Sequence, residues 1–194
     1  MALATKDIKL TPQEYLDSEL RSEIKHEYDD GYIVAMVGAS RAHNLITLRL
    51  ASLINQHLEG KPCRAYMADM KVQVRSKGKE LFYYPDVMVS CDDRPPSDYY
   101  EDKPILIIEV LSPTSETRDR LEKLAAYTSI PSLVEYFTVA QVTAEVDRYT
   151  IKGGQTILTR YQDGDTVELE SIGLSIHIKD IYADVVGQVF VDGE

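Results

Sequence analysis

One acidic residue, Glu109, lies within an otherwise apolar run, Ile105-Leu106-Ile107-Ile108-Glu109-Val110-Leu111. Leucine and β-branched side chains without polar alternation predict a central strand that is covered on both faces. An ionised carboxylate in such a strand destabilises the fold by several kcal/mol unless a cation or good hydrogen bonds compensate it. The sequence therefore predicts a buried strand with a bound metal ion at Glu109, or alternatively an ion pair there with a buried Arg or Lys.

The length and composition indicate one globular domain. The chain has 194 residues, of which 44% are hydrophobic and 27% are charged. Such a chain is large enough to bury a proper core and has the balance of a soluble protein. The N-terminal segment MALATKDIKLTPQEY has no signal-type apolar stretch, and no segment has the apolar length that spans a bilayer. We expect a single domain over residues 1–194 and no membrane partner.

The two cysteines, Cys63 and Cys91, are far apart and form no Cys-x-x-Cys pair. A disulfide scaffold or a thiolate zinc site is therefore not expected, and a reducing cytoplasm is the expected setting. The histidines also lack metal-type spacing, and we expect most of them to be surface or structural residues: His26, His43, His57 and His177.

The charge is distributed unevenly along the chain. The net charge of −11 argues at first against a nucleic-acid partner. Residues 1–90 contain 12 Lys/Arg and 12 Asp/Glu, whereas residues 91–194 contain 9 and 20. A polyanion could therefore approach a face formed by the first half, although a charge-balanced half is usually only a solvated surface. The basic residues concerned are Arg41, Arg49, Arg64, Lys71, Arg75, Lys77 and Lys79.

Capping and turn motifs locate the first elements. Thr11-Pro12-Gln13-Glu14 forms a capping box, which predicts a helix over about residues 12–20. Asp29-Asp30-Gly31 lies between two β-rich runs and predicts a hairpin. Ser40 can cap a second amphipathic helix at roughly residues 41–58.

Periodicity and turn residues predict the other elements. Strands are predicted at 70–75, 82–90 and 104–111, and the polar, proline-bearing segment 92–103 is expected to be an exposed loop. A helix is predicted at about 116–129, with an apolar face of Leu121, Leu124, Ala125 and Thr128. Later strands are predicted at about 133–139, 143–151, 155–162 and 166–170, with a short helix after Asp180. Without repeats or linkers, the chain is predicted to form one mixed α/β domain.

Two acids define the candidate chemistry. Pro85-Asp86 is predicted to close one strand and Glu109 lies in the next, with 22 residues between the acids. Neighbouring strands of one sheet would bring the two carboxylates to a shared edge, whereas Asp86 alone could be an ordinary turn residue. Two carboxylates completed by water suit Mg²⁺ or Mn²⁺ better than zinc. Such an ion supports phosphodiester hydrolysis.

These motifs resemble the PD-(D/E)xK signature of restriction-endonuclease-like nucleases. The likeness is greatest to a bacterial restriction endonuclease family in which the lysine is displaced to the following helix. The motifs cover roughly residues 12–150 in the expected order: His26-Glu27-Tyr28 with Asp30-Gly31, Gly38-Ala39-Ser40 with His43-Asn44, Pro85-Asp86-Val87, Glu109-Val110-Leu111-Ser112-Pro113, then Asp119, Lys123 and Tyr127, and finally Pro131-Ser132-Leu133 with Glu135-Tyr136.

The resemblance implies a fold and a division of roles. The implied fold is a restriction-endonuclease-like α/β domain, with a central mixed β-sheet flanked by helices and additional antiparallel strands. The nuclease core would cover about 12–150 and a C-terminal β extension about 151–194. Asp86 and Glu109 would bind magnesium. Leu111 occupies the usual lysine position, so the resemblance implies that Lys123 assists the attacking water, and Ala140 replaces an aspartate that is frequent in the family.

Further residues are supporting candidates with open alternatives. Glu27 resembles an additional metal-binding acid, but it could be a hairpin surface charge. Lys123 lies off the apolar helix face together with Asp119 and Tyr127, where a solvated pair with Asp119 is the alternative. Tyr127 could hydrogen-bond the site or only cover it. His43 could contact substrate or only solvate the start of a helix.

We therefore expect a Mg²⁺-dependent DNA endonuclease that accepts Mn²⁺, uses no small-molecule cofactor and, by analogy with related nucleases, acts as a homodimer. A non-catalytic interaction or nucleic-acid-binding module with the same fold is the competing hypothesis, because Leu111 replaces the usual lysine and the second half is acidic. The same chemistry would also allow the hydrolysis of another phosphate ester.

Overall fold

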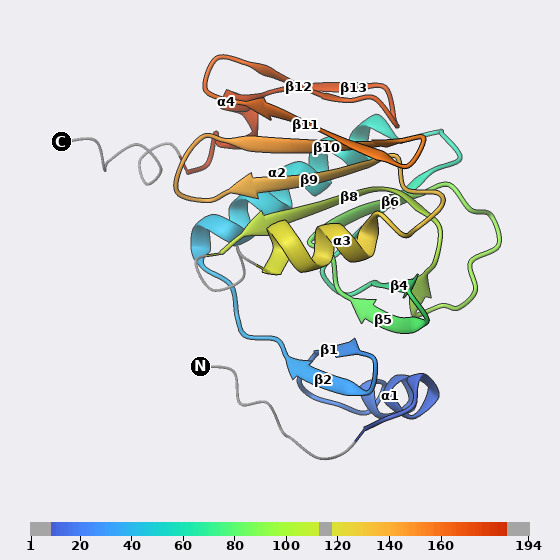
Figure 1. The fold of residues 1–194 in the computed structure, drawn as a ribbon. Helices are drawn as coiled ribbons and strands as arrows, with labels where there is room; N and C mark the ends of the chain where they lie inside the picture. Colours follow the sequence, from blue (N-terminus) through green and yellow to red (C-terminus); the bar gives the residue numbers. More distant parts are fainter. Residues whose placement is uncertain (1–8, 113–117, 186–194) are drawn as a thin grey trace.

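The computed structural model describes residues 9–112 and 118–185 (Figure 1). In chain order the elements are α1 (Pro12–Glu19), β1 (His26–Asp29), β2 (Tyr32–Ala35), α2 (Arg41–His57), β3 (Arg64–Met67), β4 (Lys71–Ser76), β5 (Lys79–Tyr83), β6 (Val87–Ser90), β7 (Tyr100–Glu101), β8 (Pro104–Leu111), the π-helical segment η1 (Arg118–Lys123), α3 (Leu124–Tyr127), β9 (Glu135–Ala140), β10 (Val146–Lys152), β11 (Gln155–Tyr161), β12 (Thr166–Leu169), β13 (Leu174–His177) and α4 (Ile178–Ile181).

The described strands form a six-stranded sheet, which is the larger one, a five-stranded sheet and a two-stranded hairpin. The larger sheet has the order β11-β10-β9-β8-β6-β3, and β8 and β9 are parallel whereas the other neighbours are antiparallel. The second has the order β2-β1-β5-β4-β7, and β12 pairs with β13. Helix α2 crosses one face of the larger sheet, while α3 covers the other (Figure 1). The expected mixed α/β fold with additional antiparallel strands is confirmed.

The central strand is covered on both faces, as its composition predicts. In β8, Leu106, Ile108 and Val110 pack in the core that includes α2, whereas Ile107 packs in the core that includes Ala126 of α3. Consecutive side chains of a strand point to opposite faces, so both faces must be apolar when helices cover both. Glu109 therefore points to the same face as Ile107, which is the face covered by α3.

Local polar motifs begin the N-terminal elements as predicted. The Thr11 N–H donates to Glu14 Oε2 at 2.8 Å, and the Glu14 N–H donates to Thr11 Oγ1 at 3.3 Å, which completes the capping box. Asp30 and Gly31, with φ of 47° and 107°, form the turn between β1 and β2. Both require the left-handed region, which Gly adopts freely and Asp tolerates. Ser40 caps α2 by accepting a hydrogen bond from the His43 N–H.

The prediction of one continuous strand at 82–90 is wrong. It is divided between β5, which ends at Tyr83, and β6, which begins at Val87. Pro85 has no N–H for a ladder hydrogen bond, so the chain leaves one sheet here and enters the other. Asp86 consequently precedes β6 instead of closing a strand. The predicted loop at 92–103 also contains the two-residue strand β7, and neither β3 nor β13 was predicted.

The predicted helix at 116–129 differs in form and in its buried face. Its described part consists of η1 followed by α3, and Leu121 is 65% exposed whereas Lys123 is 6% exposed. Assignment of the apolar face by a regular 3.6-residue period fails because a π-helical segment has a different period and because two carboxylates draw Lys123 inward. The terminal helix α4 begins at Ile178, before the predicted start.

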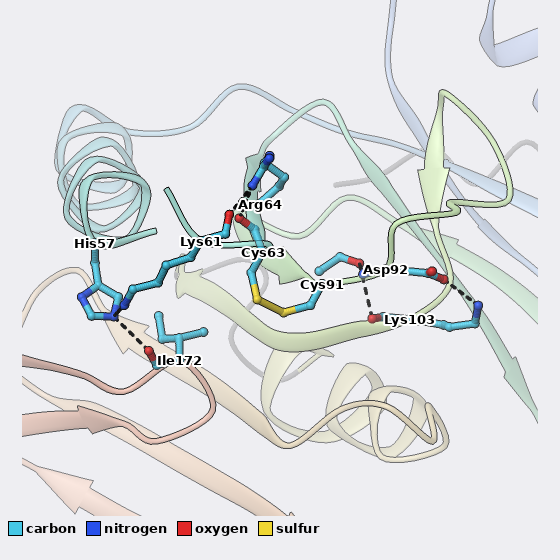
Figure 2. Close-up of a disulfide and its surroundings, with 9 residues drawn as sticks. His57, Lys61, Cys63, Arg64, Cys91, Asp92, Lys103 and Ile172 are labelled. Carbon is cyan, nitrogen blue, oxygen red and sulfur yellow. Dashed lines mark hydrogen bonds and ion pairs between the residues drawn. A yellow bond between two sulfur atoms is a disulfide. The ribbon is translucent and has the colours of Figure 1, made fainter. Parts of the chain in front are cut away.

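A disulfide scaffold was not expected, but Cys63 and Cys91 form a disulfide (Figure 2). Strands β3 and β6 are antiparallel, with Arg64 opposite Ser90. Continuing this register by one residue places Cys63 opposite Cys91. The sequence shows neither β3 nor this register, so the spacing of the cysteines alone could not predict the bond. The disulfide joins the sheet edge to the segment that follows β6.

Within residues 9–112 and 118–185, no helix combines the length and apolar character needed to cross a bilayer.

Replacing Cys63 and Cys91 together by serine should lower the free energy of unfolding by about 3 kcal/mol, because the bond closes a loop with a sequence separation of 28. Urea unfolding followed by circular dichroism would measure the change. Wild-type protein with a reductant should match the double variant. Thiol labelling that finds two free cysteines in unreduced, denatured wild type would contradict the bond and restore the original expectation.

Candidate functional site

The two candidate acids lie on neighbouring strands of the larger sheet. Val87 of β6 is opposite Ile108 of β8, so the preceding residue, Asp86, is opposite Glu109. The Val110 N–H donates to Asp86 Oδ2 at 2.7 Å, which holds this carboxylate beside the backbone next to Glu109. Directly opposed residues on antiparallel strands are neighbours. The register therefore brings together two acids that are separated by 22 residues in sequence.

A lysine and a tyrosine compensate the buried carboxylate of Glu109. Lys123 Nζ lies 2.9 Å from Glu109 Oε1, and the Tyr127 hydroxyl donates to the same oxygen at 2.8 Å. Lys123 and Tyr127 are one helical turn apart, so both side chains reach the same face of the sheet. Burial and the nearby carboxylate raise the pKa of Tyr127 well above its ordinary value, so its hydroxyl remains a donor. These contacts explain how the apolar strand accommodates a charge.

Glu27 joins the same charged cluster from the other sheet. Its Oε1 lies 3.2 Å from Lys123 Nζ and accepts a hydrogen bond from the Tyr84 N–H at 3.5 Å. The side chains of Glu27 and Glu109 are each 4% exposed, and that of Lys123 is 7% exposed. One ammonium thus contacts two buried carboxylates. Glu27 is not a hairpin surface charge, because β1 places it towards the interior.

His43 lies at the more open side of the site. As the third residue of α2, it places Nε2 at 3.2 Å from Asp86 Oδ2. The side chains of His43 and Asp86 are 15% and 19% exposed, which is more than those of the Lys123 cluster. The positive end of the α2 dipole also faces this region and favours negative charge there. His43 therefore contacts an acid of the site, while its contact with substrate stays a prediction.

A bridge of polar side chains fixes the start of α2 against the ends of two strands. The Ser40 hydroxyl, which caps α2, hydrogen-bonds Gln141 Oε1. The amide nitrogen of Gln141 donates to the Leu111 carbonyl at 2.7 Å. Since Leu111 ends β8 and Gln141 follows β9, the helix start, His43 and the carboxyl end of the central strand are held together. No local motif links these positions in the sequence.

A second ion pair anchors η1 over the sheet. The Arg120 guanidinium of η1 donates to Asp147 Oδ2, and Arg160 of β11 donates to both oxygens of Asp147 at 2.7 and 3.0 Å. Burial alone would raise the pKa of Asp147, but the hydrogen bonds from Arg160 and Arg120 outweigh it and lower that pKa below its ordinary value. Sequence reasoning missed this contact, because Arg120 and Asp147 are 27 residues apart and belong to no recognised motif.

The candidate Asp119 has its backbone in η1, but its side chain lies outside the described residues. Its supporting role stays a prediction.

The donor set suits a hydrated divalent cation. Asp86, Glu109 and Glu27 offer carboxylates while Lys123 supplies one ammonium. Thr138 of β9 lies opposite Glu109, and its buried hydroxyl has no hydrogen-bond partner among the described residues. Residues 9–112 and 118–185 contain no group of three His, Cys, Asp or Glu side chains placed to hold one ion. Asp86 and Glu109, on neighbouring strands, are the residues that could hold a divalent cation, whose other ligands would be water.

Two of the basic residues expected on a polyanion-binding face are engaged elsewhere. Lys71 is only 4% exposed, and burial lowers the pKa of its ammonium. Arg49 donates to Asp184 Oδ2 at 2.6 Å. A cavity of about 430 Å³ occurs between α2 and the β13–α4 segment, but its lining includes neither Asp86 nor Glu109. The candidate chemistry therefore rests on the carboxylates and Lys123 and not on this cavity.

A mixed sheet with acids on adjacent strands and a lysine from the following helix defines a restriction-endonuclease-like protein. The Uma2 family model, described as "Putative restriction endonuclease", matches residues 12–179. The chain belongs to this family.

Two relatives from Synechocystis sp. are both described as uncharacterized. Protein slr1290 is 40% identical over 176 residues, covering 90% of this chain and 92% of the relative. Protein sll1609 is 32% identical over 173 residues, covering 88% and 96%. A crystal structure from Anabaena variabilis, titled a "putative nuclease belonging to DUF820", has a TM-score of 0.71 and 22% identity, covering 90% of this chain and 98% of that chain. At this identity the structural match shows the shared fold.

Replacing Asp147 by asparagine should lower the free energy of unfolding by about 3 kcal/mol at pH 7, because Arg120 and Arg160 would lose their shared carboxylate. The folded-state pKa of Asp147 is lowered, so its stabilisation is present above its unfolded-state pKa of about 4 and is lost as pH falls through the folded-state pKa. Urea unfolding between pH 7 and pH 3 should show the difference from wild type shrinking.

The matched control is Asp163→Asn, because Asp163 is exposed in the turn after β11. Its stability should stay within about 0.5 kcal/mol of wild type. A deficit in Asp147→Asn that stays constant down to pH 3 would contradict the ion-pair explanation.

Proposed function

We propose that this protein is a Mg²⁺-dependent endonuclease that hydrolyses DNA phosphodiester bonds. The single observation that carries the proposal is the opposition of Asp86 and Glu109 in the strand register, with Lys123 2.9 Å from Glu109. Membership of a family described as "Putative restriction endonuclease" supports nuclease chemistry as the use of this arrangement.

Each charged residue has a proposed role. Asp86 and Glu109 would hold the cation, and Glu27 would either add a carboxylate or keep Lys123 in place. A bound Mg²⁺ would supply Lewis-acid polarisation of a phosphoryl oxygen and a lowered pKa for a water. Lys123 would orient the attacking water and stabilise the negative charge that develops on the phosphate. Tyr127 would keep the Glu109 carboxylate oriented through its hydroxyl.

The approach of DNA is proposed from the side of α2. His43 and Asp86 are the partly exposed members of the site, and Arg41 at the first position of α2 is exposed. Together with the positive end of the helix dipole, this cation offers favourable contacts to a phosphate backbone.

Other expectations remain parts of the proposal. We propose one domain over residues 1–194, with a nuclease core at about 12–150 and a β extension at about 151–194, that acts as a homodimer without a small-molecule cofactor. The cytoplasm is the proposed setting because DNA is present there. The Cys63–Cys91 disulfide is unusual for a reducing compartment, so the thiol state in rapidly quenched cell extracts would test this setting.

Cleavage of supercoiled plasmid DNA with Mg²⁺ or Mn²⁺ tests the activity. Asp86→Asn, Glu109→Gln and Lys123→Met should each lower the cleavage rate by about 10²–10³-fold, because each removes charge from the reacting centre. Asp163→Asn, at an exposed turn, should cleave like wild type. Equal cleavage by wild type and all site variants would assign the activity to a contaminant and contradict the proposal.

A non-catalytic module is the second candidate, because Leu111 replaces the usual lysine and Lys123 contacts both Glu27 and Glu109. Calorimetry with Mn²⁺ separates the two hypotheses. The endonuclease proposal predicts Mn²⁺ binding that Glu109→Gln weakens at least tenfold, together with cleavage. Binding by a folded wild type that cleaves neither DNA nor other phosphate esters would favour the module.

A further inference from the structure

Strand β11 is the longest described strand at a sheet edge. It ends the larger sheet and pairs with β10 through all seven of its residues, without a shift in register. A strand at an edge directs one row of backbone N–H and C=O groups away from its neighbour. The remaining edge strands of the described sheets are shorter: β2, β3, β12 and β13 have four residues each and β7 has two. Pairing by a further strand is therefore most favourable at β11.

The sequence of β11 has few features that oppose such pairing. It contains no proline or glycine, and its one charged residue is Arg160. The Arg160 guanidinium is directed to Asp147 of β10, so this charge is already paired on the inner side. Proteins commonly protect edge strands by charges, prolines, bulges or short length. None of these protects residues 155–159.

Both faces of this edge expose apolar side chains. Ile157 is 53% exposed and Leu158 is 51% exposed. Since consecutive residues of a strand point to opposite faces, one apolar side chain lies on each face. In the neighbouring strand β10, Val146 and Tyr149 are buried. An additional strand beside β11 would bring its own side chains next to Ile157 and Leu158 on both faces.

We propose that β11 is the interface with a second copy of this chain. The two β11 strands pair antiparallel about a two-fold axis at Leu158, which joins the two larger sheets into one continuous sheet. This register pairs all seven residues: Leu158 lies opposite Leu158 of the partner subunit, Ile157 opposite Thr159, Thr156 opposite Arg160, and Gln155 opposite Tyr161. An interface of this kind uses the same patch on both copies, so it closes after two.

The axis at Leu158, the middle residue of β11, pairs the most residues and keeps the two Arg160 side chains apart. With the axis at Leu158, Arg160 faces an uncharged threonine. An axis at Arg160 would place two guanidiniums opposite each other and would leave fewer residues paired, and like charges in that position are destabilising. This interface rests on the homodimer of the proposed function, but it uses none of the residues Asp86, Glu109 or Lys123, so dimerisation and nuclease activity can fail separately.

Light scattering after size-exclusion chromatography tests the assembly on the full chain. Wild type should be a dimer at about 100 µM, and Leu158→Lys should raise the dissociation constant at least tenfold, because two ammoniums would face each other in place of two apolar side chains. The matched control is Leu48→Lys on α2, where the leucine is also 51% exposed. It should remain dimeric. A monomeric wild type, or equal dimerisation by both lysine variants, would overturn the proposal.

Crosslinking tests the register without depending on the lysine variants. Because Cys63 and Cys91 are bonded to each other, Leu158→Cys adds one free thiol. Opposed residues in antiparallel strands have Cα atoms about 5 Å apart, within the range of a disulfide. Mild oxidation should therefore give a covalent dimer. Thr156→Cys should not, since its copies would lie about 14 Å apart along the strands. Crosslinking by Thr156→Cys and not by Leu158→Cys would overturn the register.

Discussion

The structure around the candidate site depends on the contact of one ammonium with two buried carboxylates. Lys123 Nζ lies 3.2 Å from Glu27 and 2.9 Å from Glu109, and these acids come from different sheets. Removal of Lys123 would leave both carboxylates buried without a compensating cation, which is strongly destabilising. The same contact therefore joins the two sheets and stabilises charged groups in a low-dielectric interior, where electrostatic interactions are stronger than in water.

Contacts outside the site determine where this lysine lies. The Arg120–Asp147 pair holds the beginning of the described helical segment against β10, and the hydrogen bond from Tyr127 to Glu109 holds its end against β8. Between them, the π-helical segment directs Lys123 towards the sheet, although a regular period had placed it on a solvated face. Leu111 stands two residues after Glu109 on the same strand, and the ammonium that contacts Glu109 comes from Lys123 on a neighbouring element. The helix must therefore be positioned accurately for the site to exist.

The parts of the fold that were predicted correctly depend on neighbours in the sequence. Thr11 and Glu14 form a capping box, Asp30-Gly31 forms a turn, and the apolar run around Glu109 forms a doubly covered strand. The errors occur where distant segments decide the outcome. The strand at 82–90 divides because the chain changes sheets at Pro85, and Cys63 bonds Cys91 because β3, a strand that was not predicted, pairs with β6.

The sequence by itself determined that the apolar run carries Glu109 and that Asp86 lies before it in the chain. It determined further that Glu109 requires compensation, because a lone charge in a buried apolar strand is destabilising. It also determined the family, through motifs in a fixed order. Only the tertiary structure decided that Lys123 provides the compensation, that Glu27 shares it, and that Asp86 lies opposite Glu109. The physical reason is that strand register and helix position arise from pairing and packing between segments that are far apart in the chain, and these leave no local pattern.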